Sequence, residues 1–180
     1  MALTRVKTPA LSQGSSFLTS VSSSDMPAGT IIQVKRNVGT TEYSTSSTST
    51  YANIADINTT ITPKSANSVL FFQMSVQTFK NSMTNGQSGC EFRLRDNTND
   101  TVIMDYRGIA FHNNNGAAYL SQNMQYSAFN ATTSASNTNA REYRLEFRLD
   151  STYNEHSIIY IGWNTNTNSA QSMVIYEIAV

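Results

Sequence analysis

Apolar and polar residues alternate with a period of two along most of this chain, and this pattern restricts the fold more than any other feature. The clearest run covers residues 68–80, where Leu70, Phe72, Met74 and Val76 fall on one face. Alternation of this kind is typical of a β-strand with one buried face. Similar runs occupy residues 30–37, 57–61, 90–95, 102–104, 119–129, 143–149, 158–161 and 173–180.

Clusters of Asn, Gly, Ser and Thr separate these runs, and no stretch has the period of an amphipathic helix. The 180 residues correspond to one domain. About eight to ten short strands in one domain predict an all-β protein with a jelly-roll-like antiparallel sandwich.

The composition excludes several classes of protein. The chain has 24 Ser, 22 Thr and 19 Asn, whereas only 13% of its residues are charged and the formal net charge is zero. A general nucleic-acid binder needs a basic excess. The 9 Tyr, 8 Phe and 1 Trp argue against a disordered chain. No run approaches the roughly 20 apolar residues of a membrane helix. The first residues lack the apolar core of a signal peptide, so we expect synthesis in a cytoplasm without export by that route.

The chain divides into two predicted parts, an extended N-terminal docking arm over residues 1–29 and a sandwich knob over residues 30–180. The apolar residues of the arm follow no regular period. They are Val6, Leu11, Phe17, Leu18 and Val21. Ordering such a segment costs about 1–2 kcal/mol per residue, so it needs a partner surface. We expect these five side chains to dock on that surface; the alternative is a tail without fixed structure.

Two predicted strands carry charge on the face away from the core. The charged residues are Glu91, Arg93 and Arg95 in one strand and Arg144, Glu146 and Arg148 in the other. Such side chains either form a solvated face, which discourages pairing with a further strand, or make ion pairs with another subunit. The sequence leaves both interpretations open.

Few residues have the spacing of a metal or catalytic site. His112 and His156 lie in different predicted loops, whereas a structural metal site needs about four converging ligands. Cys90 falls on an inward strand position, where a free thiol acts as a small apolar side chain. The run Asp-Asn-Thr-Asn-Asp at 96–100 resembles the start of a calcium loop but lacks its Gly and distal Glu. It predicts a hairpin turn instead.

Glycosidases need two carboxylates that flank the scissile bond. Asp105 and Glu155 have no context that marks them as such a pair. We therefore predict no enzyme activity, no metal and no cofactor.

Four aromatic residues near predicted loops are candidates for stacking on sugars. They are Tyr106, Phe111, Tyr119 and Trp163. Aromatic side chains at strand ends more often pack in a core or an interface. Both interpretations stay open.

Three segments carry a resemblance to a known family. They read Pro-Ala-Gly-Thr-Ile-Ile-Gln-Val at 27–34, Ile-Asn-Thr-Thr-Ile-Thr-Pro-Lys-Ser-Ala-Asn-Ser-Val-Leu at 57–70 and Met-Val-Ile-Tyr-Glu-Ile at 173–178. In this order they resemble the small knob domains of virion proteins of tailed phages, especially phages of marine and cyanobacterial hosts. The resemblance covers residues 27–180.

The resemblance implies a jelly-roll-like sandwich, similar in plan to tumour-necrosis-factor and C1q heads, that forms a homotrimer. It implies a place in the virion, as a capsid decoration or a tail-fibre tip, with other virion proteins as partners. It brings no catalytic residues, and it does not cover the residues before Pro27.

Among the possible functions, the sequence favours a trimeric capsid decoration, cement or head-knob protein anchored by its arm. The chain has one knob, one short arm and none of the shaft repeats that a fibre needs. The alternative is a tail-fibre or receptor-binding knob that recognises host-surface polysaccharide. An enzyme such as a depolymerase is a third hypothesis, since fold alone does not fix function. Neither nucleic acid nor a membrane is expected as a partner.

Overall fold

A computed structural model describes residues 26–81, 86–113, 123–154, 158–162 and 171–180. Within these ranges the chain forms β-strands and a short 3₁₀ turn at Ala55–Ile57. The strands are β1 (Ile31–Gly39), β2 (Tyr43–Thr45), β3 (Ala52–Asn53), β4 (Thr59–Ile61), β5 (Val69–Asn81), β6 (Gly86–Asp96), β7 (Thr101–Asn113), β8 (Asn123–Ser134), β9 (Arg141–Asn154), β10 (Ile158–Ile161) and β11 (Gln171–Ile178). The predicted all-β class is confirmed.

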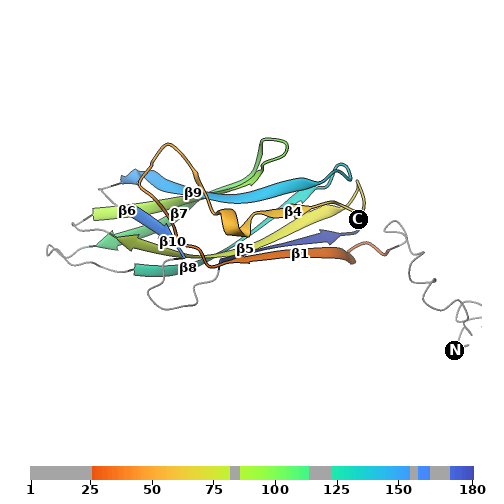
Figure 1. Ribbon diagram of the computed structural model, residues 1–180, viewed down its shortest axis with the longest axis horizontal. Helices are drawn as coiled ribbons and strands as arrows, with labels where there is room; N and C mark the ends of the chain where they lie inside the picture. Colours follow the sequence, from red (N-terminus) through yellow and green to blue (C-terminus); the bar gives the residue numbers. More distant parts are fainter. Residues whose placement is uncertain (1–25, 82–85, 114–122, 155–157, 163–170) are drawn as a thin grey trace, which may run out of the picture.

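The strands form two antiparallel sheets that pack face to face (Figure 1). The first sheet has the order β1-β11-β5-β8, and β10 and β2 extend it along the second half of β5. The second sheet has the order β9-β6-β7, with the short strands β3 and β4 both paired to β9. Each sheet thus interleaves strands from the two halves of the chain, the arrangement of a jelly roll built from two Greek keys.

The core lies between the sheets and contains the side chains that alternation placed inward. In β5, Leu70, Phe72, Met74 and Val76 are fully buried, as predicted. Across the core, Tyr143 of β9 meets Phe72 with ring centroids 4.8 Å apart. Burying each large apolar side chain contributes roughly 1.5–3 kcal/mol.

Cys90 is also fully buried, as its inward position predicted. Burial raises the pKa of its thiol well above the ordinary value, and the nearby carboxylates of Glu91 and Asp150 act in the same direction. The neutral thiol therefore acts as an apolar core side chain.

The strand predicted over residues 57–61 is only partly correct. The chain makes a 3₁₀ turn at Ala55–Ile57 first, and β4 covers Thr59–Ile61. In the turn, the Ile57 N–H bonds to the Ile54 carbonyl at 3.3 Å, so a local bond replaces pairing with a neighbouring strand. Ile57, Thr59 and Ile61 are nevertheless all buried, which explains the alternation in the sequence.

The described chain is tied to its C-terminal segment before β1 begins. Residues 27–30 form a turn in which the Thr30 N–H bonds to the Pro27 carbonyl at 3.1 Å. Gly29 occupies the left-handed region there, with a φ of 86°, which glycine adopts without strain. Gly29 and Thr30 then exchange backbone hydrogen bonds with Ala179 at 2.8 Å each. The chain therefore enters β1 beside the end of β11 (Figure 1).

A buried carboxylate connects β11 to β1 and to the turn that precedes β5. Glu177 is fully buried. Its Oε1 accepts hydrogen bonds from the N–H groups of Lys64 at 2.8 Å and Ser65 at 3.0 Å and from the Ser68 hydroxyl at 2.6 Å. Its Oε2 accepts one from Gln33 Nε2 at 2.6 Å. Burial alone would raise the pKa of Glu177, yet these hydrogen bonds hold it below its ordinary 4.5.

We predict that Glu177→Gln destabilises the protein by roughly 2–4 kcal/mol, because an amide cannot accept hydrogen bonds at both terminal atoms and leaves buried donors unpaired. Urea unfolding monitored by circular dichroism measures this loss. Glu42→Gln is the matched control, since Glu42 is exposed, and should change stability by less than about 0.5 kcal/mol.

The pH dependence gives an independent check. A carboxyl whose pKa is lower in the folded state stabilises the protein above its unfolded pKa and loses that contribution as the pH falls. The difference in stability between wild type and Glu177→Gln should therefore narrow as the pH drops below 4.5. A constant difference from pH 7 to pH 3 would show that the carboxylate charge is not the cause.

Candidate functional site

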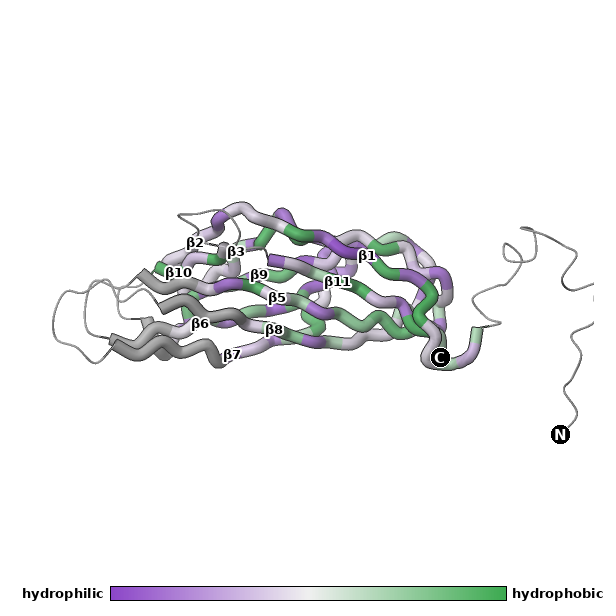
Figure 2. The backbone as a smooth tube through the Cα atoms, turned by 90° about the horizontal axis from the view of Figure 1, so that it is seen from below, coloured by the Kyte–Doolittle hydropathy of each residue, from purple (hydrophilic) through white to green (hydrophobic). Residues whose placement is uncertain are grey.

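The first sheet is rich in hydrophobic residues at the end of the sandwich where β1 begins (Figure 2). Strand register places Val34 beside Tyr176 and Tyr176 beside Phe71, so these three form one ladder across the sheet. A second ladder runs from Ile31 through Ile178 to Val69. We call the following residues the apolar face: Ile31, Val34, Val69, Phe71, Val174, Tyr176 and Ile178.

The apolar face is accessible in the described chain. Ile31 is 54% exposed and Val34 is 50% exposed, and the other members are partly exposed. The rings of Phe71 and Tyr176 lie 6.0 Å apart. Arg36 and Gln73 flank Val174 in the next ladder and mark where the face becomes polar. A contiguous exposed apolar area of this kind is typical of a protein–protein contact.

The free edge of β1 is partly closed by its own polar side chains. Gln33 Nε2 donates to the Thr62 carbonyl at 2.7 Å, and Asn37 donates to the Asn58 carbonyl. Both bonds cross from the first sheet toward the segment around β4. Gln33 and Asn37 are thus used within the chain, whereas Ile31 and Val34 are exposed.

Most of the charged residues of β6 and β9 pair with each other inside one chain. Glu91 is fully buried, and its Oε2 lies 2.6 Å from Arg148 Nη2. Arg93 Nε lies 2.5 Å from Glu146 Oε2 in the same register. These ion pairs therefore need no partner from another subunit, and their arginine side chains remain partly exposed.

Tyr51 covers this charged cluster. Its ring lies 4.0 Å from Arg93 Cζ and 4.5 Å from Arg148 Cζ. Its hydroxyl donates to Glu91 Oε2 at 3.1 Å and lies 3.3 Å from Asp105 Oδ1. Burial and the Asp105 carboxylate raise the pKa of Tyr51 to about 12. The phenol is therefore neutral at physiological pH and remains a hydrogen-bond donor.

The segment around Tyr51 is held on the outer surface of the second sheet by backbone contacts. The Leu149 N–H donates to the Ser47 carbonyl at 2.9 Å. Alternation assigns faces to each strand, but it does not reveal that a segment distant in sequence covers one of them. Apart from one aromatic residue among Ser and Thr, no pattern in the sequence indicates this cover.

The structure describes the sequence-predicted sugar contacts only in part. Tyr106 lies in β7 and is 43% exposed, with its ring edge against Phe129 at 5.2 Å between centroids. The backbone of Phe111 also belongs to β7, but its side chain lies outside the described residues. Tyr119, Trp163 and the arm residues Val6, Leu11, Phe17, Leu18 and Val21 also lie outside them.

The run 96–100 forms the predicted hairpin turn between β6 and β7. Asp96 Oδ1 accepts hydrogen bonds from the N–H groups of Thr98 and Asn99, both at 3.0 Å. Across the described ranges, no three His, Cys, Asp or Glu residues cluster as metal ligands would. In the same ranges, no helix is long and apolar enough to cross a membrane.

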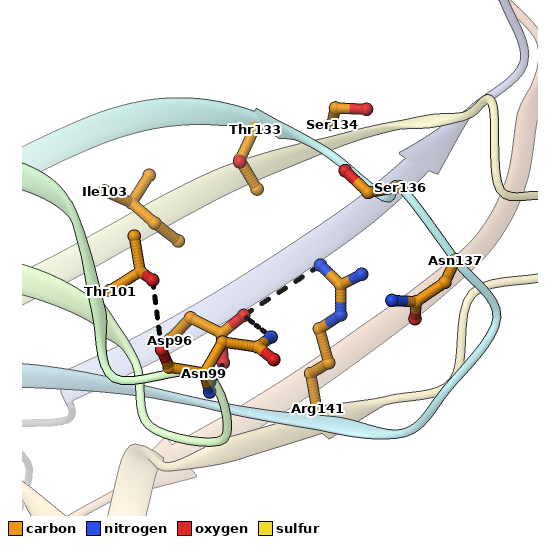
Figure 3. A pocket seen from close by; sticks show the side chains of 9 residues that line it. All are labelled: Asp96, Asn99, Thr101, Ile103, Thr133, Ser134, Ser136, Asn137 and Arg141. Carbon is orange, nitrogen blue, oxygen red and sulfur yellow. Dashed lines mark hydrogen bonds and ion pairs between the residues drawn. The ribbon is translucent and has the colours of Figure 1, made fainter.

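A polar pocket of about 300 Å³ lies beside this turn. Figure 3 shows that its lining comes from three separate segments. The β6–β7 hairpin contributes Asp96 and Asn99, the end of β8 and the loop after it contribute Thr133 and Ser136, and β9 contributes Arg141. The pocket and β1 lie at opposite edges of the first sheet, because β8 and β1 are its outermost strands on the two sides.

The chain matches no protein-family model and no curated protein. Solved structures of infectious bursal disease virus overlap with it at low identity. The structure of the Gx strain is 12% identical over 82% of this chain, with a TM-score of 0.35. A T=1 particle derived from this virus is 13% identical over 84%, with a TM-score of 0.36. The chain spans 37% of the length of each of these proteins, and the scores are too low to define a shared topology.

We predict that Glu91→Gln destabilises the protein by roughly 2–4 kcal/mol. Removing one partner of a buried ion pair usually costs about 3–5 kcal/mol, and Arg148, still partly exposed, recovers some hydration. Chemical denaturation measures the loss.

Asp100→Asn provides the contrast. Asp100 pairs with Arg95 but its side chain is 77% exposed, so its loss should cost less than about 1 kcal/mol. Its φ of 54° also suits asparagine. Equal effects from both variants would mean that burial does not govern these ion pairs.

Proposed function

We propose that this chain is a virion structural protein, a homotrimeric capsid decoration, cement or head-knob protein that its N-terminal arm anchors to the particle. The proposal rests first on the apolar face. A decoration protein must bury surface against copies of itself and against the particle, and the apolar face offers such a surface on the sheet that the arm enters.

The family resemblance supports the proposal because its three segments meet at one place in the fold. Gln33 from the first segment, Ser68 from the second and Glu177 from the third are joined by hydrogen bonds. In this chain the three segments therefore form one hydrogen-bonded unit. Jelly rolls occur among viral capsid and lectin domains, although the fold by itself does not determine the function.

The arm has a suitable point of departure. Hydrogen bonds between Gly29 and Ala179 fix the chain beside the apolar face, immediately before β1. The described chain thus begins at that end of the sandwich. Avidity from three arms of one trimer would compensate for the modest apolar content of each arm.

We predict that the purified protein is a trimer of three 19.8 kDa chains and that Val34→Lys converts it into a monomer. The lysine places charge in the apolar face, where burial between copies would leave it unpaired. Multi-angle light scattering measures the mass, and the melting temperature of the monomeric fold should change little because Val34 is half exposed.

Val102→Lys is the matched control. Val102 is 47% exposed in β7 of the second sheet, outside the apolar face, and its substitution should leave the trimer intact. A wild-type protein that stays monomeric at micromolar concentration, or a trimer that survives Val34→Lys, contradicts this assignment.

We also predict that deletion of residues 1–26 leaves a folded trimer that no longer attaches to particles. The deletion stops before the turn that bonds to Ala179, so the sandwich keeps its described contacts. Phe17→Asp combined with Leu18→Asp should weaken attachment in the full chain. Particle sedimentation with bound protein quantified by gel densitometry tests both. Normal occupancy by the truncated protein would assign docking to the sandwich instead of the arm.

A second candidate function is a tail-fibre or receptor-binding knob that recognises host-surface polysaccharide. The polar pocket beside the β6–β7 turn favours it, because its hydroxyl and amide groups suit a polyhydroxyl ligand. The number of copies per particle separates the two candidates. Hundreds of copies per particle support decoration, whereas about a dozen support a tail position.

A further inference from the structure

The floor of the polar pocket is a buried pair of opposite charges. Asp96 is 5% exposed and Arg141 is 6% exposed. The Asp96 oxygens are occupied by donors from the turn, including Asn99 Nδ2 at 2.7 Å. Because hydrogen-bond donors already occupy this carboxylate, it is unsuitable as a cation ligand. The opposite charges of Asp96 and Arg141 leave the floor of the pocket close to neutral.

Arg141 has donors that the protein does not use. Its Nη2 bonds to the Ala135 carbonyl. Its Nη1 lies 3.9 Å from Asp96 Oδ2, close enough for an ion pair but too far for a hydrogen bond. Its Nε is enclosed and has no acceptor at hydrogen-bond geometry among the residues that the structure describes, and the guanidinium interacts with the Tyr143 hydroxyl. A buried guanidinium with unused N–H groups is costly unless another acceptor completes it.

The wall of the pocket offers groups that both donate and accept. Within the described chain, the hydroxyls of Thr133, Ser134 and Ser136 form no hydrogen bond. Ile103 adds one apolar surface to this lining (Figure 3). A ligand that matches this wall carries several hydroxyl groups and one face of C–H bonds.

Backbone conformation sets this corner apart from the rest of the described chain. Asp100 and Ser136, with φ values of 54° and 59°, are its two non-glycine residues in the left-handed region. One belongs to the hairpin and the other to the loop, so both pocket-forming loops hold a conformation that most side chains avoid. Such conformations persist where surrounding structure enforces them, and they are frequent at ligand sites.

We propose that this pocket binds one neutral sugar ring of a glycan. The paired charges of Asp96 and Arg141 disfavour a strongly charged ligand. Arg141 Nη1 suits a sugar oxygen, the hydroxyls suit sugar hydroxyls, and Ile103 suits the C–H face of a pyranose. A volume of about 300 Å³ is at the lower end for ligand pockets, which fits a single ring and not a chain of several.

This inference deepens the second candidate function, the recognition of host-surface polysaccharide, and it rests on that proposed function. It concerns the purified protein, so it holds or fails whatever place the chain has on a particle. Attachment and copy number test the particle role separately.

Saturation-transfer NMR on the full chain tests the proposal. The probes are methyl glycosides of glucose, galactose, mannose, N-acetylglucosamine and glucuronic acid, each titrated alone. At least one neutral glycoside should give a saturable signal with a dissociation constant on the order of 1–10 mM, the range for a small ligand in a shallow pocket. No saturation by any neutral probe below about 50 mM, or saturation by the glucuronide alone, overturns the proposal.

Two neighbouring threonines provide a matched pair of variants. Thr133 lines the pocket, whereas Thr132 lies on the opposite, outer side of β8 beside Phe71. Thr133→Tyr should fill the pocket and weaken binding at least about tenfold, and Thr132→Tyr should change it less than about twofold. Matching circular dichroism spectra and melting temperatures confirm that both variants fold. Unchanged binding by a folded Thr133→Tyr protein would place the sugar elsewhere and refute the assignment.

Discussion

The buried Glu177 carboxylate is the interaction on which this end of the sandwich depends. It joins the last strand, the turn before the longest core strand and the first strand, and it does so with charge-assisted hydrogen bonds in a site closed to solvent. The apolar face and the exit point of the arm both lie on strands that this carboxylate aligns. A change at Glu177 would therefore alter the surfaces that the proposed assembly uses as well as the stability of the fold.

Alternation in the sequence is sufficient to predict the central parts of β5, β6 and β9, because their inward residues fill one core, but it predicts only residues 102–104 of the long strand β7. Alternation does not predict the short elements of secondary structure. β2 and β3 are too short to show a period, and at Ile57 a 3₁₀ turn buries the side chain as a strand would. The alternation of apolar residues indicates which side chains are buried in the core. The backbone hydrogen bonds determine whether those residues form a strand or a turn.

The surfaces were harder to predict than the core. The charges of β6 and β9 were recognised as outward-facing, but the segment that brings Tyr51 over them shows no periodic pattern. The pocket is a similar case. Asp96 is typical of a turn residue, yet nothing in the sequence connects it to Thr133 or Arg141, because the packing of the two sheets brings Thr133 of the first beside Asp96 and Arg141 of the second.

The enclosure of Glu91 by Arg148 and Tyr51 bears on the environments in which the fold survives. Salt shortens the range of exposed electrostatic interactions to about 3 Å at 1 M, which weakens pairs such as Arg95 with Asp100. A pair shielded from solvent is screened much less. Heating also lowers the cost of removing charges from water, so the enclosed pairs contribute relatively more when warm. The ion pair between Glu91 and Arg148 beneath Tyr51 is therefore suited to high salt and to heat, conditions in which exposed ion pairs contribute little to stability.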